Sequence, residues 1–501
     1  MLQKDGSIII NNWVKGVGAS PYVGFEAIRC LNVSDQPGIL KINSKLDDMA
    51  HSVALGAPYW LERTPYNGSS LRLYCSGAAK LHKYQNNSWI NTSAGPSHSN
   101  GSGLLAWPFS NTGKSYIFGA GNVKLDVMDT SSEVWTNGWQ TIVQAKTDVN
   151  GLSFHPMIAT QTNVIYGGAG NKIFSIKQKT GKTFSPSDTG TYTFTAAALD
   201  LPSAYNVKCL AEMGSYLLIG TYAYGRQDVA DVFLWDINYE PVSFDRVLKI
   251  NSVAGINAMV VFNNLAYIQA GTKGEWFVTN GSSVEKFAQI PRQMRLANNY
   301  YVWPAAIAMV EGKIFFGLSS FAGDNGGNSG IYSLDTKTGT IVLEHLIPGS
   351  EDGTNADVNI HAILPIGATS SSDQDFLISY TDNQNTKTKV AQLSTTGYIY
   401  DNSEAYLISR FYVVAGKNIK KTFRATELRL NKPLVSGESV IIKYRTANNG
   451  SWTNYETFNT TGQQTFYGRA ISNIETIQFK IILDAAASRI SGPEPIEFIA
   501  Y

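Results

Sequence analysis

The sequence carries little charge for its length. Charged residues make up 16% of the 501 residues, against about 25% in a typical soluble domain. Neutral polar side chains must therefore cover much of the surface. The 40 basic and 39 acidic residues nearly cancel, at a formal net charge of +1. This balance argues against a general electrostatic attraction to nucleic acid or to an anionic membrane.

Cysteines and long apolar runs are also scarce. The three cysteines, Cys30, Cys75 and Cys209, are far apart and show no C-x-x-C spacing, so we expect buried apolar residues rather than disulfides or a zinc site. No stretch approaches the roughly 18 apolar residues of a membrane span. The start of the chain has three consecutive isoleucines, where a secretory signal needs about 7 to 15 apolar residues. We therefore expect no membrane span, and assembly in a cytoplasm.

Sequence motifs for nucleotide binding and catalysis are missing. The segments 110–115 (SNTGKS) and 178–183 (QKTGKT) place Pro108 and Ile176 where a phosphate-binding loop needs its first glycine. We interpret both segments as turns. Neither a G-x-S-x-G elbow nor an H-E-x-x-H helix occurs, and we expect no enzyme activity and no cofactor.

Isolated polar residues offer weaker hints of a site. His155 and His361 fall on strands that we expect to be innermost in their units, where a hydrogen-bonded core histidine is the favoured interpretation. Loops around Asp324 and Asp352 contain oxygen ligands suited to calcium but lack EF-hand spacing. We assign no metal site, and leave calcium at these two loops open.

A four-strand pattern takes the place of such motifs. In residues 256–290, four short β-like runs are separated by Asn-Asn, a Gly-containing break and Asn-Gly. Asn and Gly tolerate the positive φ angles of tight hairpins. A single four-stranded meander has two open faces and two open edges, so it is not expected to be stable alone.

The pattern recurs along most of the chain. Its second strand begins at seven positions: Leu71, Tyr116, Val164, Leu217, Ala266, Lys313 and Phe376. Spread over residues 54–409, seven copies give a period of roughly 50 residues, close to that of propeller blades. Closing the ring buries each apolar face on its neighbours. We predict an all-β fold with an irregular β-propeller of about seven four-stranded blades.

Two further regions flank the predicted propeller. From residue 410 to 501 the alternation changes: in SVIIKYRT, Val440, Ile442 and Tyr444 share a face opposite Lys443 and Arg445, which is typical of a β-sandwich.

Residues 1–53 are rich in Gly and Pro and have no period, which is typical of an extended docking arm. Its large side chains must pack either on the chain's own propeller or on a neighbouring subunit, and the sequence leaves both open. The candidate partner-docking residues are Trp13, Tyr22, Phe25, Ile28, Arg29 and Pro37.

The arm NNWVKGVGASPYVGFEAIRCLNVSDQPGILKINSKL and the ending ISGPEPIEFIAY, on either side of an irregular propeller, resemble the tail hub or nozzle (tail tubular) proteins of short-tailed double-stranded DNA bacteriophages. The resemblance implies a structural virion protein of the tail. It implies a homo-oligomeric, usually hexameric, ring below the portal and adaptor that encloses the channel through which DNA passes. Tail fibre proteins are the other implied partners. The low charge agrees, because each neutralised phosphate would add affinity for the passing DNA.

A carbohydrate-binding or carbohydrate-cleaving propeller is the alternative, with the terminal sandwich as a glycan-binding module. Cleavage would need two carboxylates about 5 to 9.5 Å apart across a cleft. The sequence lacks Ser-x-Asp-x-Gly-x-Thr-Trp boxes of sialidase-type blades, since NNSWINT and NGSWTNY contain the tryptophan without the aspartate.

Overall fold

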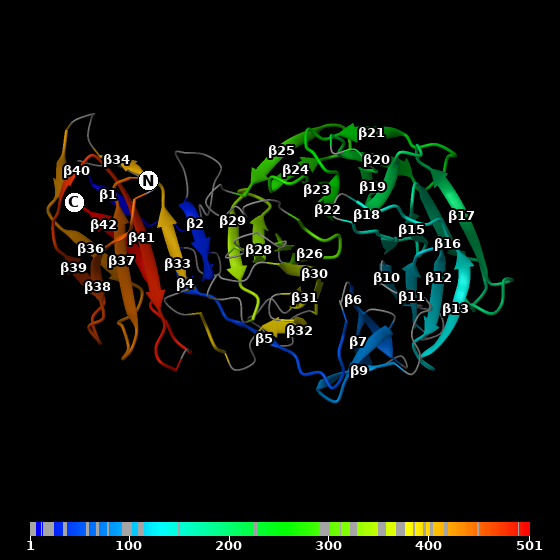
Figure 1. Cartoon of the computed structure of the whole chain (residues 1–501), viewed down its shortest axis with the longest axis horizontal. Coiled ribbons are helices and arrows are strands. Elements are labelled where there is room, and N and C mark those ends of the chain that lie inside the picture. Colours follow the sequence, from blue (N-terminus) through cyan, green and yellow to red (C-terminus); the bar gives the residue numbers. More distant parts are fainter. Residues whose placement is uncertain are drawn as a thin grey trace.

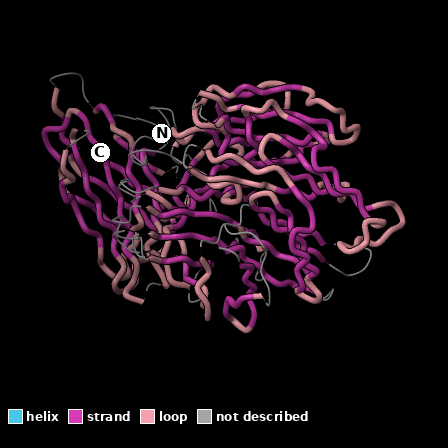
Figure 2. Tube along the Cα trace, turned by 45° about the vertical axis from the view of Figure 1, so that its right-hand side comes forward, coloured by secondary structure: helices cyan, strands magenta, loops and turns pink. Residues whose placement is uncertain are grey.

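The computed structural model shows an all-β chain with a rounded propeller at one end and a sandwich at the other (Figure 1). It describes residues 7–11, 13, 25–33, 38–56, 60–66, 70–77, 80–92, 103–108, 115–148, 151–224, 226, 228–290, 301–310, 312–320, 328–348, 357–366, 376–383, 386–393, 397–400, 404–414, 419–447, 450–488 and 490–501. Strands and loops make up this part of the chain (Figure 2). No helix that could span a membrane occurs among these residues.

The propeller consists of seven four-stranded antiparallel blades within the described residues. Blades 1 to 3 are β6 (Leu61–Tyr66), β7 (Ser70–Gly77), β8 (Lys80–Gln85) and β9 (Ser88–Asn91); β10 (Gly103–Pro108), β11 (Ser115–Gly121), β12 (Lys124–Asp129) and β13 (Val134–Thr141); and β14 (Met157–Ala159), β15 (Ile165–Ala169), β16 (Lys172–Gln178) and β17 (Tyr192–Asp200). Blades 4 and 5 are β18 (Tyr205–Met213), β19 (Tyr216–Ala223), β20 (Asp231–Asp236) and β21 (Arg246–Lys249); and β22 (Ile256–Phe262), β23 (Leu265–Ala270), β24 (Glu275–Thr279) and β25 (Val284–Gln289).

The last two blades close the ring. Blade 6 consists of β26 (Ile307–Val310), β27 (Lys313–Leu318), β28 (Gly330–Asp335) and β29 (Ile341–His345). Blade 7 consists of β30 (Val358–Pro365), β31 (Phe376–Asp382), β32 (Lys387–Leu393) and, from the N-terminal region, β5 (Leu46–Asp48). The first strands of consecutive blades contact one another, and β30 contacts β6 to complete the circle. The prediction of a propeller with about seven four-stranded blades is confirmed, and every predicted repeat supplies the second strand of a blade.

The turn residues explain the hairpins within a blade, and the burial of the strands explains why the blades form a ring. Asn263 and Asn264 both have positive φ, at 50° and 59°, as a two-residue hairpin between β22 and β23 requires. Most second strands are largely apolar, and β11 and β31 are buried from end to end. A strand buried on both faces is stable only between two neighbouring sheets, and the ring provides these neighbours.

The C-terminal region forms two packed sheets and a short pair of strands. Its strands are β33 (Tyr406–Ser409), β34 (Tyr412–Val413), β35 (Lys421–Phe423), β36 (Thr426–Leu430), β37 (Ser439–Arg445), β38 (Thr453–Phe458), β39 (Thr465–Gly468), β40 (Ile471–Ile474), β41 (Thr476–Asp484) and β42 (Pro495–Ala500). One sheet has the order β42-β36-β39 and the other contains β33-β41-β37-β38. Phe479 of β41 meets Phe498 of β42 with ring centroids 5.0 Å apart, so the two sheets face each other across a shared core.

The N-terminal arm contributes strands to both regions. Here β1 (Ile8–Ile10) pairs with β42, while β2 (Phe25–Arg29) pairs with β33 and lies parallel to β29. After the short hairpin of β3 (Leu31–Asn32) and β4 (Lys41–Ile42), β5 pairs with β32 as the outer strand of blade 7. Strand β2 thus joins blade 6 to the sandwich in one ten-stranded sheet.

Two strands cross the expected limits of 1–53, 54–409 and 410–501. Strand β5 lies within the expected arm but belongs to the propeller, and β33 lies within the expected propeller but pairs with β41 of the sandwich. Both pairings join segments that are distant in sequence. The pairing of such strands depends on the rest of the sheet and not on the sequence of the strand alone.

Candidate functional site

A cluster of polar and aromatic side chains gathers where the first strands of the blades converge. The ladders of β18, β22 and β30 each shift register at one residue: Lys208, Asn257 and His361. A bulge leaves one residue out of the ladder and re-aims its side chain. Three blades therefore use the same device at the same level of the innermost strand. We call Asp148, Phe154, Lys208, Tyr222, Asn257, Tyr301, Trp303 and His361 the axial cluster.

A buried ion pair lies in the axial cluster. Nζ of Lys208 donates hydrogen bonds to Oδ2 of Asp148 at 3.1 Å and to Oδ1 of Asn257 at 3.0 Å. The hydroxyl of Tyr301 donates to the same Asp148 oxygen at 3.1 Å. Both charged side chains are 1% exposed. Burying two charges is costly unless each is well paired, and the two additional hydrogen bonds meet that requirement.

Aromatic rings surround this pair. Nζ of Lys208 lies 4.4 Å from the ring centroid of Tyr301, 5.3 Å from that of Phe154 and 5.9 Å from that of Tyr222. Trp303 bridges Phe154 and His361, at 5.7 and 4.4 Å between ring centroids. All of these residues are buried. The cluster fills the middle of the propeller with its own side chains.

Burial controls the protonation of these groups. It lowers the pKa of Lys208, and the charge of Asp148 opposes this shift. Burial also raises the pKa of Tyr301, and Asp148 adds to the effect. The pKa of His361 falls to about 3 because the ring is desolvated, so the ring is neutral at ordinary pH, with Nε2 3.1 Å from the Thr381 hydroxyl.

These properties describe a locked network rather than a reactive centre. The one carboxylate of the cluster, Asp148, is held by Lys208 and Tyr301. A glycosidase of the usual kind needs two carboxylates facing a substrate. Among the described residues, no group of three or more His, Cys, Asp or Glu side chains could hold a metal ion. His155 contacts the carbonyl oxygen of Gly168 at 3.2 Å, as expected of a core histidine.

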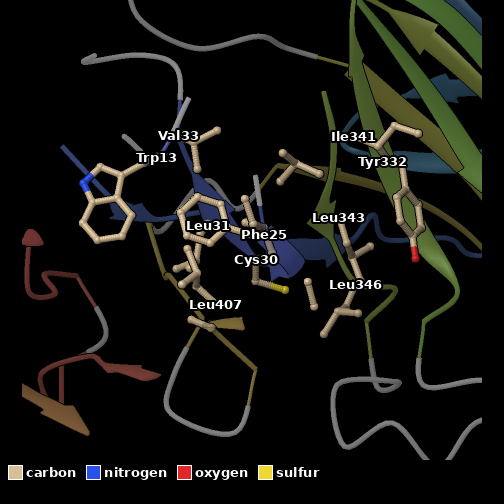
Figure 3. Packing of buried hydrophobic residues seen from close by; sticks show 14 of the residues in the cluster. Trp13, Phe25, Cys30, Leu31, Val33, Tyr332, Ile341, Leu343, Leu346 and Leu407 are labelled. Carbon is tan, nitrogen blue, oxygen red and sulfur yellow. The ribbon is translucent and has the colours of Figure 1, made fainter. Parts of the chain in front are cut away.

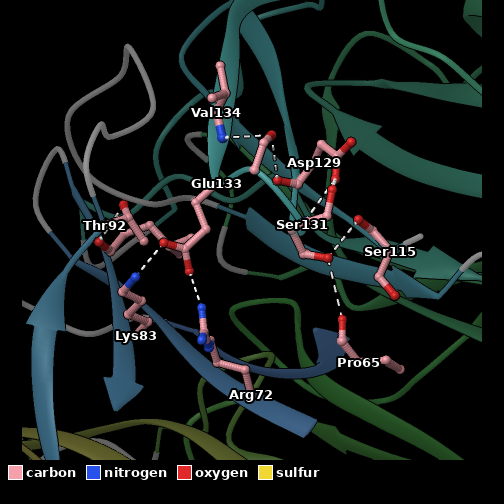
Figure 4. Close-up of polar contacts among 12 residues, drawn as sticks. Pro65, Arg72, Lys83, Thr92, Ser115, Asp129, Ser131, Glu133 and Val134 are labelled. Atoms are coloured by element: carbon pink, nitrogen blue, oxygen red, sulfur yellow. Dashed lines mark hydrogen bonds and ion pairs between the residues drawn. The ribbon is translucent and has the colours of Figure 1, made fainter. Parts of the chain in front are cut away.

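Blades 1 and 2 are tied by a second polar group, on the turn between β12 and β13 (Figure 4). The carboxylate of Glu133 pairs with both Arg72 and Lys83 of blade 1. The Thr130 hydroxyl donates to the carbonyl oxygen of Ser115 at 2.9 Å and lies 3.4 Å from that of Pro65. These contacts fix the first blade, whose sequence is the least regular, against its neighbour.

The structure places four of the six candidate docking residues inside this chain. Trp13 and Ile28 are fully buried, Phe25 is 4% exposed and Arg29 is 7% exposed. Trp13 stacks on Phe25, with centroids 6.1 Å apart, and Phe25 lies near Leu31 and Leu407 (Figure 3). These four side chains therefore pack within their own chain. Tyr22 and Pro37 lie outside the described residues.

Other sequence features have plain structural outcomes. Gln178 ends β16 and residues 179–183 begin the loop to β17, where Gly181 has φ +70° and Gln178 donates to the Lys182 carbonyl. This is the predicted turn. Residues 110–114, Asp324 and Asp352 lie outside the described residues. The three cysteines are buried and free, as predicted.

Sequence reasoning did not find Lys208 or Asp148. The signal for Lys208 was present, because a polar residue stands directly before a small residue in the first strand of three blades: Lys208 before Cys209, Asn257 before Ala258 and His361 before Ala362. A polar residue at a recurring position inside apolar strands indicates an axial site. Asp148 lies outside any strand, between β13 and β14, and carries no such pattern.

Comparison with protein-family models and with curated proteins finds no match. Among solved structures, BBS1N in complex with ARL6DN is similar at a TM-score of 0.42 and 11% identity, over 72% of this chain and 100% of that one. An exo-β-1,3-galactanase from Phanerochaete chrysosporium with galactose is similar at a TM-score of 0.30 and 11% identity, over 92% of this chain and 100% of that one. At such low values the likenesses carry no argument about function.

Proposed function

We propose that this chain is a structural subunit of a short-tailed bacteriophage tail, which assembles as a ring, hexameric in the family it resembles, below the portal and adaptor. The arm and the terminal residues carry the resemblance to nozzle proteins. The structural observation that favours a scaffold is the axial cluster. Its charged groups satisfy one another, and its rings occupy the space where a propeller enzyme would need room for substrate.

The closed propeller axis has a consequence for the path of DNA. A duplex cannot pass through a propeller whose middle is filled by Lys208, Tyr301 and Trp303. In a ring of such subunits the DNA must travel through the lumen between protomers. The near-zero net charge suits that lumen, since few counterions would be released by transient contact with phosphates.

The arm supports a mechanical role as well. Strand β2 continues blade 6 into the sandwich, and β5 completes blade 7. Backbone hydrogen bonds therefore run between propeller and sandwich, where a flexible linker would allow hinge motion. A ring that transmits force during DNA ejection benefits from subunits that do not bend.

The deciding experiment combines assembly mass with an activity assay. Mass photometry of the purified chain, alone and with a portal–adaptor complex, should reveal a closed ring in the presence of that complex. The same preparation should release no sugar from bacterial polysaccharides. A chain that stays monomeric on the portal–adaptor complex and cleaves polysaccharide would contradict the structural role and support the carbohydrate alternative.

A further inference from the structure

A row of cations lies on the outer face of the sheet where the arm joins the sandwich. Lys443 of β37 stands directly opposite Lys480 of β41, and Arg29 of β2 stands directly opposite Tyr406 of β33. Tyr406 in turn faces Ile482, two residues from Lys480 on the same side of β41. These four side chains, the seam cluster, thus share one face of four consecutive strands.

The opposite face of these strands is the sandwich core. Ile442, Leu407 and Ile481 are fully buried there, and strict alternation along each strand turns the seam cluster away from them. Lys443, Lys480 and Tyr406 are only half-buried. Arg29 is buried, at 7% exposed, whereas water and small solutes can reach the three half-buried side chains.

No carboxylate pairs with either lysine within the described part of the chain. Among the described residues, neither Lys443 nor Lys480 forms an ion pair or a side-chain hydrogen bond. Nζ of Lys480 lies 3.7 Å from the ring centroid of Tyr406, and Cζ of Arg29 lies 5.7 Å from the same ring. Like charges directly opposite each other destabilise a sheet. Burial, Lys443 and Arg29 together lower the pKa of Lys480 to about 8.

Neighbouring acids are engaged elsewhere. Glu26 of β2 accepts a hydrogen bond from the side-chain amide of Gln478, whose Oε1 accepts one from Nε of Arg445. Glu404 pairs with Lys45 at 3.0 Å. Within the part of the chain that the structure describes, Lys443 and Lys480 therefore stand on neighbouring strands without a carboxylate partner.

We propose that the seam cluster binds a tetrahedral oxyanion, phosphate or sulfate, between Lys443 and Lys480. Side chains directly opposite each other on antiparallel strands start about 5 Å apart, so two ammonium groups can donate to different oxygens of one anion. The bound anion would neutralise the repulsion at the strands that link the arm to the sandwich. Anion binding would thereby stabilise this junction, by the linkage between binding and folding.

Isothermal titration of the full-length chain with inorganic phosphate, and separately with sulfate, tests the site at low ionic strength. We expect saturable binding of one anion, weakened at least tenfold by Lys480→Met and by Lys443→Met. Lys480→Arg keeps the charge and should bind within about threefold of the unmodified protein. The matched control is Lys172→Met, which removes a half-buried lysine on blade 3 and should leave binding unchanged.

Thermal unfolding provides the second readout and checks the fold of each variant. Sulfate should raise the melting temperature of the unmodified protein and of Lys172→Met more than that of Lys480→Met. Sulfate keeps its charge, so its affinity should fall above pH 8 as Lys480 loses its proton, facing Lys443, Arg29 and Tyr406. Absence of saturable binding, or equal affinity in the folded Lys480→Met and Lys443→Met variants, would overturn the proposal.

Discussion

Replacing Lys208 by methionine should destabilise the propeller more than any surface charge change. Methionine fills most of the lysine stem's volume, so the loss is mainly electrostatic. Asp148, 1% exposed, would keep the Tyr301 hydroxyl at 3.1 Å but lose its cation. Removing one partner of a buried pair typically costs about 3 to 5 kcal/mol. We expect a loss of this size in the free energy of unfolding.

Urea unfolding followed by tryptophan fluorescence measures this loss, through the shift of the midpoint at constant slope. The double variant Lys208→Met/Asp148→Asn removes both charges of the axial pair, so it should be more stable than Lys208→Met alone. The exposed pair of Lys172 and Asp200 is the control, and Lys172→Met should cost less than about 1 kcal/mol. If Lys208→Met cost no more than the control, or the two axial substitutions were additive, the locked network would be refuted.

Three further predictions concern the arm, the half-buried acid Glu62 and a close backbone approach. Leu46→Ala in β5, where Leu46 is 3% exposed, should cost about 2 to 5 kcal/mol and increase proteolysis of blade 7. Burial raises the pKa of Glu62 to about 8; the folded state therefore holds this proton more tightly, and stability should fall by roughly 3 to 5 kcal/mol between pH 4.5 and 8. Glu62→Gln should flatten that pH dependence in urea titrations, and an unchanged profile would contradict the assignment. Gly103→Ala would place Cβ 1.9 Å from the carbonyl oxygen of His155, so its melting temperature should drop by several degrees, whereas a neutral effect would contradict the packing.

The repeat architecture could be predicted because it depends on local pattern. Blades carry their own turns, such as Asn263–Asn264, and a largely apolar second strand, such as β23. These signals lie within a few residues of one another. Because the same signals recur about every 50 residues, the number of blades could be counted from the sequence.

The arm's pairings could not be predicted because they join distant segments. Strand β5 has three residues, too few for an alternating pattern, and Leu46 pairs with Leu393 at the far end of the propeller sequence. Strand β2 places the apolar Ile28 and the charged Arg29 next to each other, and both are buried. The pairing partners of such short strands therefore depend on the folded sheets and cannot be inferred from the strands themselves.

Both polar clusters were missed for a related reason. Lys208 and Asp148 are charged residues in the interior, and a charge run or motif search does not detect a pair separated by 60 residues. Lys443 was predicted to face away from the core, but its position opposite Lys480 depends on the register between β37 and β41. Register follows from the whole sheet, because a slip of one residue would turn every side chain to the other face.

The most direct test of the account is single-particle electron microscopy of the chain assembled on a portal–adaptor complex. We predict a closed ring whose central lumen lies between subunits, with each propeller axis filled by density for Lys208, Tyr301 and Trp303. Isolated subunits with an open, solvent-filled propeller axis would contradict both the closed axial cluster and the proposed place of this chain in a phage tail.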